Sequence, residues 1–295
     1  MRCLMHSFSR SCCLLTLLVL ASLLAVNCSA PVQKPTGPGH DYDSAKDMFK
    51  RGRFDRALDL TDGLSTANPT SEYTERARVL RAVIYAGQLK SSKQLAEGYG
   101  KGSETTKNPH FKAEYVRLRH DNLQYAARTA LGLAETAHQL AADGTLPKEA
   151  TLEASFPTTE GPVEIAALAR VEQGGWIEPD VQDNTATDAL RKGVDDALAD
   201  AVAGDRSKAR NALAGGSTKI GGADFAIFLA KEIADGAVVF DRKHGRDPQK
   251  LKTLCDEGDE IVKAGLALLK DSPDKDKEKE LKKLQDKFKT IIKNG

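Results

Sequence analysis

The longest helical pattern in the sequence runs from Pro109 to Asp143. Its apolar residues recur at the three- and four-residue spacing that places them along one side of a helix. A periodic run longer than about 25 residues indicates one long helix of a repeat protein or two abutting helices. We expect a bend at Gly132 and an end at Gly144. The apolar positions of the pattern are Tyr115, Leu118, Leu123, Ala127, Leu131, Ala134 and Leu140.

Composition favours helices along the rest of the chain. Aromatic residues make up only 5% of the 295 residues, Ala and Leu are abundant, and the alternation of Val, Ile and Thr that is typical of strands is scarce. The sequence therefore predicts an all-α protein.

The first 27 residues have the parts of an export signal. Arg2 and Arg10 supply a positive start, and an apolar stretch of 15 residues follows from Cys12 to Val26. This stretch is shorter than the roughly 20 residues that a membrane span needs. Removal of residues 1–27 takes away two arginines and no acidic residue, which leaves 41 basic and 42 acidic side chains. Such a balance gives no reason to bind nucleic acid.

The segment 24–28, Leu-Ala-Val-Asn-Cys, ends the signal. It resembles a bacterial lipobox, in which Leu, a small or β-branched residue, and Gly, Ala or Ser precede a cysteine that becomes lipidated. Asn27 departs from this pattern, and the leucine stands one position early. The resemblance implies cleavage before Cys28 and lipidation of its thiol. Ordinary cleavage after Ala30 is the alternative.

Cysteine usage agrees with a lipid anchor. Three of the five cysteines lie in the signal, which leaves Cys28 and Cys255, so the mature chain has no internal disulfide framework. Cys255 is expected to be a small apolar residue of a helix. The lipidated cysteine and a flexible tether rich in Pro and Gly make up residues 28–40. The helical domain follows over residues 41–295, with a sub-boundary near 145–184.

The most informative stretch comes directly after the tether. We expect a short helix over residues 41–51 and a second over about 54–67. Gly52 between them removes the Cβ clash of a left-handed helix end. Ala57 leaves room for a neighbouring helix, and Pro69 cannot continue the helix that precedes it.

Together with Phe54, these residues resemble the second half of a tetratricopeptide (TPR) repeat over residues 44–69. In that family the glycine and the aromatic shape the turn, the small residue lets the two helices approach, and the proline closes the unit. The first helix lacks the large residue that the family usually carries near its start. The resemblance implies antiparallel helix pairs stacked as a divergent TPR-like α-solenoid.

Further helix pairs are expected downstream. A helix over residues 71–86, ended by Gly87, and a partner over 89–99 make one pair. Gly204 and Ala209 repeat the spacing of five that separates the glycine and the alanine of the first unit.

The second half of the chain is read in the same way. The region 146–184 is the least regular, with one helix expected over 162–173. Two helices between residues 225 and 269 are separated near Asp247-Pro248, a good N-cap followed by a residue that suits a first helical turn. A lysine-rich helix over 274–293 should pack as the terminal cap.

No residue set predicts catalysis or metal binding. His120 and His138 lie about 27 Å apart if both stand on one helix, so they cannot share a metal, and no ligand motif is found among the five histidines outside the signal. The run 215–219 contains Gly, Ser, Thr and Lys but lacks the order of a phosphate-binding loop, and we expect a loop between helices. We expect no enzyme, no metal and no cofactor.

Trp176, the only tryptophan, is the first choice for a binding surface, together with Arg170. An indole offers a large contact area with one hydrogen-bond donor. The alternative is that Trp176 fills a gap between helices.

The resemblances imply a cell-envelope lipoprotein that acts as a non-catalytic adaptor for a protein or peptide partner. Ser29 is not the Asp that retains many lipoproteins in the inner membrane, which favours the outer membrane, facing the periplasm. A component of a transport system that binds a small molecule in the periplasm is the alternative function. A soluble periplasmic or secreted protein is the alternative location.

Overall fold

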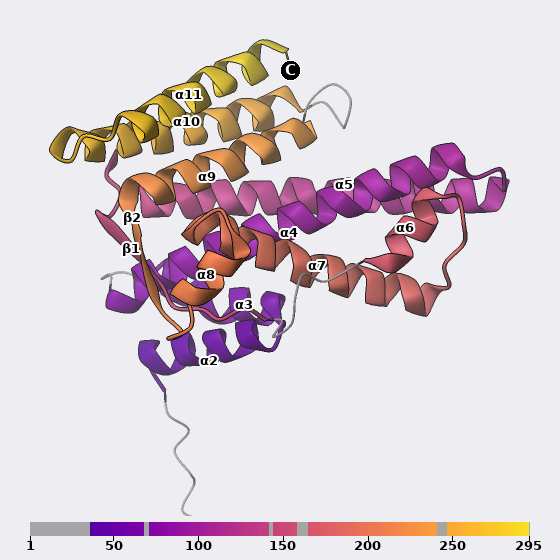
Figure 1. Ribbon diagram of the computed structural model, residues 1–295, viewed down its shortest axis with the longest axis horizontal. Helices are drawn as coiled ribbons and strands as arrows, with labels where there is room; N and C mark the ends of the chain where they lie inside the picture. Colours follow the sequence, from indigo (N-terminus) through magenta and orange to yellow (C-terminus); the bar gives the residue numbers. More distant parts are fainter. Residues whose placement is uncertain (1–35, 68–70, 142–143, 158–164, 241–246, 295) are drawn as a thin grey trace, which may run out of the picture. The chain divides into compact units, whose positions relative to one another are not determined.

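Helices make up most of the described chain. The computed structural model describes residues 36–67, 71–141, 144–157, 165–240 and 247–294, and over these ranges it contains ten α-helices and one two-stranded sheet (Figure 1). The predicted helical class is confirmed. Helices α2 to α11 belong to one compact unit, Pro38–Gly295.

Two long helices form the centre of this unit. Helices α4 (Glu72–Thr105) and α5 (Pro109–Leu140) run antiparallel against each other as a hairpin (Figure 1). The turn between them is short because Asn108 caps α5, where its side chain accepts a 2.9 Å hydrogen bond from the backbone N–H of His110. The pattern from Pro109 is thus one helix that continues through Gly132.

The predicted break at Gly87 is wrong, because α4 runs through it without interruption. Helix α7 (Pro179–Val202) crosses α4 at this point. A Cβ atom on Gly87 would lie 2.6 Å from the Cα atom of Val194, and one on Gly193 would lie 2.9 Å from the backbone nitrogen of Ser91. Each glycine therefore allows a close approach of the two helix backbones rather than a turn.

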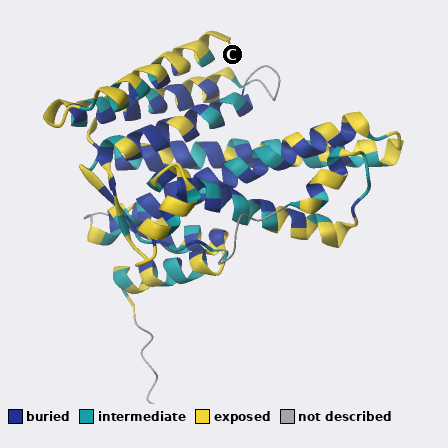
Figure 2. Ribbon diagram, viewed as in Figure 1, coloured by how far each residue is buried: buried dark blue, intermediate teal, exposed yellow. Residues whose placement is uncertain are grey.

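Helix α4 is enclosed on all sides over part of its length. The six consecutive residues from 79 to 84 are all buried (Figure 2), which is typical of a helix that is covered all round. The neighbours that cover α4 include α3, α5, α6, α7 and the first strand.

The TPR-like stretch forms a helix pair, α2 (Pro38–Lys50) and α3 (Phe54–Ser65). The first helix begins three residues before the expected start. Gly52 adopts φ +72° in the turn, the left-handed conformation that favours glycine. Phe54 and Ala57 are buried, and the ring of Phe54 meets that of Phe49 edge to face at 5.4 Å. Pro69 lies outside the described residues.

A similar turn joins α7 to α8 (Arg206–Ala212). Gly204 adopts φ +67°, and Asp205 caps α8 by accepting a 2.9 Å hydrogen bond from the backbone N–H of Lys208. Ala209 is fully buried. At both places the Gly-to-Ala spacing of five accompanies a left-handed glycine and a buried alanine, whereas only the second helix has a side-chain cap.

The C-terminal helices form a group of three, α9 (Gly222–Ala237), α10 (Pro248–Asp271) and α11 (Lys275–Asn294). A 3-10 turn, Val238–Phe240, extends α9, and both α9 and α10 pack on α5. The predicted start of α10 is confirmed, because Asp247 accepts a 3.1 Å hydrogen bond from the backbone N–H of Lys250. Helix α11 is held mainly by the buried Leu281, Leu284 and Phe288.

The irregular region contains a strand that the sequence did not reveal. Strand β1 (Glu149–Leu152) pairs antiparallel with β2 (Thr218–Gly221), so that Ala150 lies opposite Ile220. The expectation of a loop over residues 215–219 is therefore wrong from Thr218 onward. Helix α6 (Ala166–Glu172) follows later in this region and packs on α4.

Candidate functional site

The predicted surface residue Trp176 lies half-buried in the turn between α6 and α7. Its ring stacks on that of Phe111, with the ring centroids 4.7 Å apart and the planes 20° from parallel. The hydroxyl of Tyr115 on α5 donates a hydrogen bond to the backbone oxygen of Gly175. Trp176 thus packs against a second, smaller apolar cluster, formed by Leu95, Tyr99, Tyr115, Leu168, Val171, Ile177 and Ala189.

Arg170, the other predicted surface residue, is exposed on α6. Burial raises the pKa of Tyr115, and the charge of Arg170 opposes this effect, so both predicted residues lie around the same tyrosine. In this cluster Trp176 has the contacts expected of a residue that fills a gap between helices.

A groove of about 980 Å³ lies between the C-terminal end of α7 and the helices α9 and α11. Its lining combines the apolar side chains of Ile227, Phe228 and Leu284 with charged residues of both signs. Three ion pairs join α9 to α11 beside it, between Lys231 and Glu280, Lys277 and Asp224, and Lys287 and Asp235.

A second cavity of about 490 Å³ lies among α4, α7 and α9. The two cavities adjoin, because both are lined by Lys90, Asp200, Gly204, Glu232 and Asp235. We refer to the two cavities together as the central groove. It is built from helices that lie far apart in the sequence.

A partly buried ion-pair network lies where the two cavities meet. The ammonium nitrogen of Lys90 lies 2.6 Å from Oε1 of Glu232 and 2.9 Å from Oδ2 of Asp200. The side chain of Glu232 is only 5% exposed, and its second oxygen, Oε2, is buried without a hydrogen-bond partner within the described ranges. The network ties α4, α7 and α9 together and leaves one carboxylate oxygen unsatisfied.

Burial changes the protonation of this network. It raises the pKa of Glu232 to about 7, against the opposing charge of Lys90. For Lys90, burial alone would lower the pKa, but the carboxylates of Glu232 and Asp200 outweigh it and raise the pKa above its ordinary value. Lys90 is therefore charged at neutral pH, whereas burial disfavours the charged form of Glu232.

This arrangement can bind a charged or hydrogen-bonding group and can transfer a proton. The described residues that line the smaller cavity are mostly lysines and carboxylates, and they include no Ser, Thr, Cys or His.

The sequence carried one signal that could have revealed this network. Helix α9 has a buried stripe through Phe225, Phe228, Leu229 and Gly236, and Glu232 occupies a position on it. A carboxylate within an apolar stripe is rarely buried unless it is paired. Its partners, Lys90 and Asp200, could not be chosen, because nothing local in the sequence relates either residue to Glu232.

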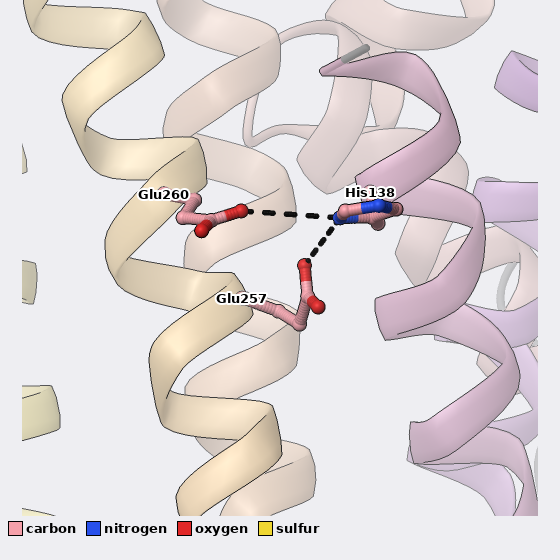
Figure 3. Close-up of side chains that lie close together, drawn as sticks. All are labelled: His138, Glu257 and Glu260. Atoms are coloured by element: carbon pink, nitrogen blue, oxygen red, sulfur yellow. Dashed lines mark hydrogen bonds and ion pairs between the residues drawn. The ribbon is translucent and has the colours of Figure 1, made fainter. Parts of the chain in front are cut away.

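A second group of polar side chains joins α5 to α10 (Figure 3). Nδ1 of His138 lies 2.9 Å from Oε2 of Glu257 and 3.8 Å from Oε2 of Glu260. The glutamates stand one helical turn apart, and both point toward the imidazole (Figure 3). Motif spacing did not reveal this cluster, because the histidine and the nearer glutamate are 119 residues apart. His120 lies beside Gln124 instead.

The remaining cysteine in the described chain, Cys255, is buried in α10. Burial raises the pKa of its thiol to about 11, so the reactive thiolate is scarce at neutral pH. This environment is the one expected of a small apolar helix residue.

Cys28 and the signal segment lie outside the described residues. Within the described ranges, no helix combines the length and the apolar character that are needed to cross a membrane. Comparison with protein-family models, curated proteins and solved structures gave no match.

Proposed function

We propose that the protein is a lipid-anchored adaptor of the bacterial cell envelope, which binds a segment of a partner protein in the central groove. The observation that carries this proposal is the groove itself, with its apolar lining and its charged residues of both signs. The signal-like segment and Cys28 supply the anchor, with the outer membrane, facing the periplasm, as the proposed location. The proposed role is non-catalytic and does not involve nucleic acid.

The groove has the features that an extended peptide needs. A volume of about 980 Å³ reaches the upper end of the usual range for small-molecule sites, roughly 300–1,000 Å³. The charged groups of the partner would meet the lysines and carboxylates of α9 and α11, and its apolar side chains would lie against the aliphatic parts of these lysines, because Phe228 and Leu284 are themselves buried. Such a lining gives modest affinity with clear selectivity for charge pattern.

The helix pair α2–α3 supports the finer part of the proposal, that the chain is a divergent TPR-like solenoid. The turn at Gly52 and the close packing of Ala57 have the geometry that the resemblance implies. The turn at Gly204 before α8 follows the same pattern. We propose that these pairs descend from a repeat scaffold whose binding surface is now the central groove.

The test is site-specific photocrosslinking in cells. A photoreactive residue replaces Lys283, which lines the groove, or Lys289, which is exposed on the same helix and is not among the groove residues. We expect a specific protein adduct from position 283 and a much weaker one from position 289. Equal adducts from both positions would show that the groove does not select the partner.

The anchor is tested separately. Intact-mass analysis and membrane fractionation of the wild type beside Cys28→Ala should show a lipid mass and membrane association that the variant loses. A mature protein that begins at Pro31 and fractionates as soluble would refute the anchor. The groove experiment would then apply to a freely diffusing periplasmic or secreted protein.

One observation favours a second function, binding of a small charged molecule in the smaller cavity. Its wall carries the buried Lys90–Glu232 pair and an unsatisfied carboxylate oxygen. In that case native mass spectrometry of the purified protein should show a bound small molecule, and Glu232→Gln should lose it. A copurifying protein without a small-molecule adduct would instead favour the adaptor.

A further inference from the structure

The cluster of His138, Glu257 and Glu260 is separate from the central groove. It joins α5 to α10 (Figure 3), and the residues that line the groove come from neither of these helices. We propose that these three side chains form a surface binding site for a transition-metal dication, with Zn²⁺ as the first candidate. The site would be completed by water.

The distances suit a single ion. One ligand atom from each side chain lies within 4.8 Å of the other two. In a tetrahedral zinc site with bonds of about 2.0–2.2 Å, ligand atoms are separated by about 3.4 Å. The distances from Nδ1 of His138 to the two carboxylates, 2.9 and 3.8 Å, lie on either side of this value. Small side-chain rotations would therefore bring all three atoms into the coordination sphere.

Charge also favours a cation at this place. Within the described ranges, neither Glu257 nor Glu260 forms an ion pair with a lysine or an arginine, and both face His138. The hydrogen bond with the imidazole accounts for Glu257 alone, because Glu260 at 3.8 Å is beyond hydrogen-bond reach. Two carboxylates that converge without a cation repel each other, and a dication would neutralise both.

The ligand types select among metals. Imidazole together with carboxylate suits Zn²⁺ and neighbouring transition metals, whereas Ca²⁺ and Mg²⁺ prefer sites made of oxygen alone. The side chains of His138 and Glu260 are 63% and 59% exposed, so water can occupy the remaining positions. A bound ion would link the C-terminal part of α5 to α10.

The test uses the full-length chain, purified in detergent without an affinity tag and stripped of metal with a chelator. Isothermal titration with ZnCl₂ should show one saturable site, and the melting temperature should rise with the free Zn²⁺ concentration because the ion binds the folded state. Loss of an outer partner of a metal ligand already weakens affinity about 10–100-fold. His138→Ala and Glu260→Gln should therefore each weaken binding at least about tenfold.

His120→Ala is the matched control, because His120 is an exposed histidine of the same helix that contacts Gln124 and no carboxylate in the described structure. It should bind Zn²⁺ as the wild type does, and CaCl₂ should produce no comparable stabilisation. The proposal is overturned if the wild type shows no one-to-one binding. It is also overturned if His120→Ala loses as much affinity as His138→Ala, or if both cluster variants keep the wild-type affinity.

Discussion

The closest approach between α4 and α7 leads to the sharpest stability prediction, for Gly193→Ala. In an ordinary helix this change is stabilising, because glycine is about 0.8–1 kcal/mol worse than alanine in a helix interior. Here the added methyl group would overlap the backbone oxygen of Gly87 and would lie 2.9 Å from the backbone nitrogen of Ser91. Backbone atoms cannot rotate away as the end of a side chain can, so the helices must separate.

The expected magnitude follows from these two opposing terms. Overpacking of a close-packed interior costs about 1–3 kcal/mol, and a clash with backbone belongs in the upper part of this range. Subtracting a propensity gain of up to about 1 kcal/mol leaves a net loss of roughly 1–2 kcal/mol. For a domain of this size, such a loss lowers the melting temperature by several degrees, at about 2–4 °C per kcal/mol.

Urea unfolding followed by circular dichroism measures this loss, with an unchanged m-value as the sign that only stability has changed. Gly63→Ala is the matched control, since Gly63 lies within α3 and a Cβ atom there would meet nothing within 4 Å. It should raise stability by about 0.5–1 kcal/mol. If Gly193→Ala stabilises the protein as Gly63→Ala does, the close crossing of α4 and α7 does not exist.

Three other predictions concern the buried charge, the buried thiol and the last helix. The pKa of Glu232 in the folded state, about 7, lies above its ordinary value. This group therefore contributes stability below about pH 4.5 that is lost as the pH rises to about 7. Glu232→Gln should flatten the pH dependence of the unfolding free energy, measured with urea, over this window, and an unchanged profile would contradict the burial effect. Peptide mapping after treatment with a thiol reagent should find Cys255 unlabelled until urea unfolds the chain, and rapid labelling of the native protein would contradict its burial. Phe288→Ala, at a residue that is 1% exposed, should lower the free energy of unfolding by about 3–5 kcal/mol and speed hydrogen exchange in α11. Its control is Ile292→Ala, at a residue that is 43% exposed, which should change this free energy by no more than about 0.5 kcal/mol.

Local signals in the sequence predicted the local parts of the fold. The turn at Gly52 and the N-cap at Asp247 depend on residues within five positions of each other, and the structure shows both. The long helix from Pro109 was visible because one side of it remains polar over many turns. In each case the signal lies within a single helix or a single turn and depends on no distant segment.

Contacts between distant segments could not be predicted in this way. Gly87 resembled a helix end because its role depends on Gly193, more than 100 residues later, and nothing in its neighbourhood indicates a crossing helix. Strands β1 and β2 are four residues each, and in the part of the chain that the structure describes they pair only with one another. A strand of that length carries too few alternations to be distinguished from a loop.

The two polar clusters show the same limit at the level of function. Glu232 could have been noticed as a carboxylate on an apolar stripe, but only the fold selects Lys90 as its partner. His138 and Glu260 are ordinary exposed residues and Glu257 is half-buried, and none of the three stands out in its own helix. Their chemistry appears only when α5 and α10 lie side by side.

The enclosure of α4 has a consequence for how the chain reaches its folded state. Helix α4 is among the earliest elements along the chain, yet the helix that covers it at Gly87 ends only at Val202. A polypeptide made from its N-terminus onward completes the α4–α5 hairpin about 60 residues before the end of α7. Until then the apolar surface of α4 that α7 covers stays in contact with water, a state that is prone to aggregation.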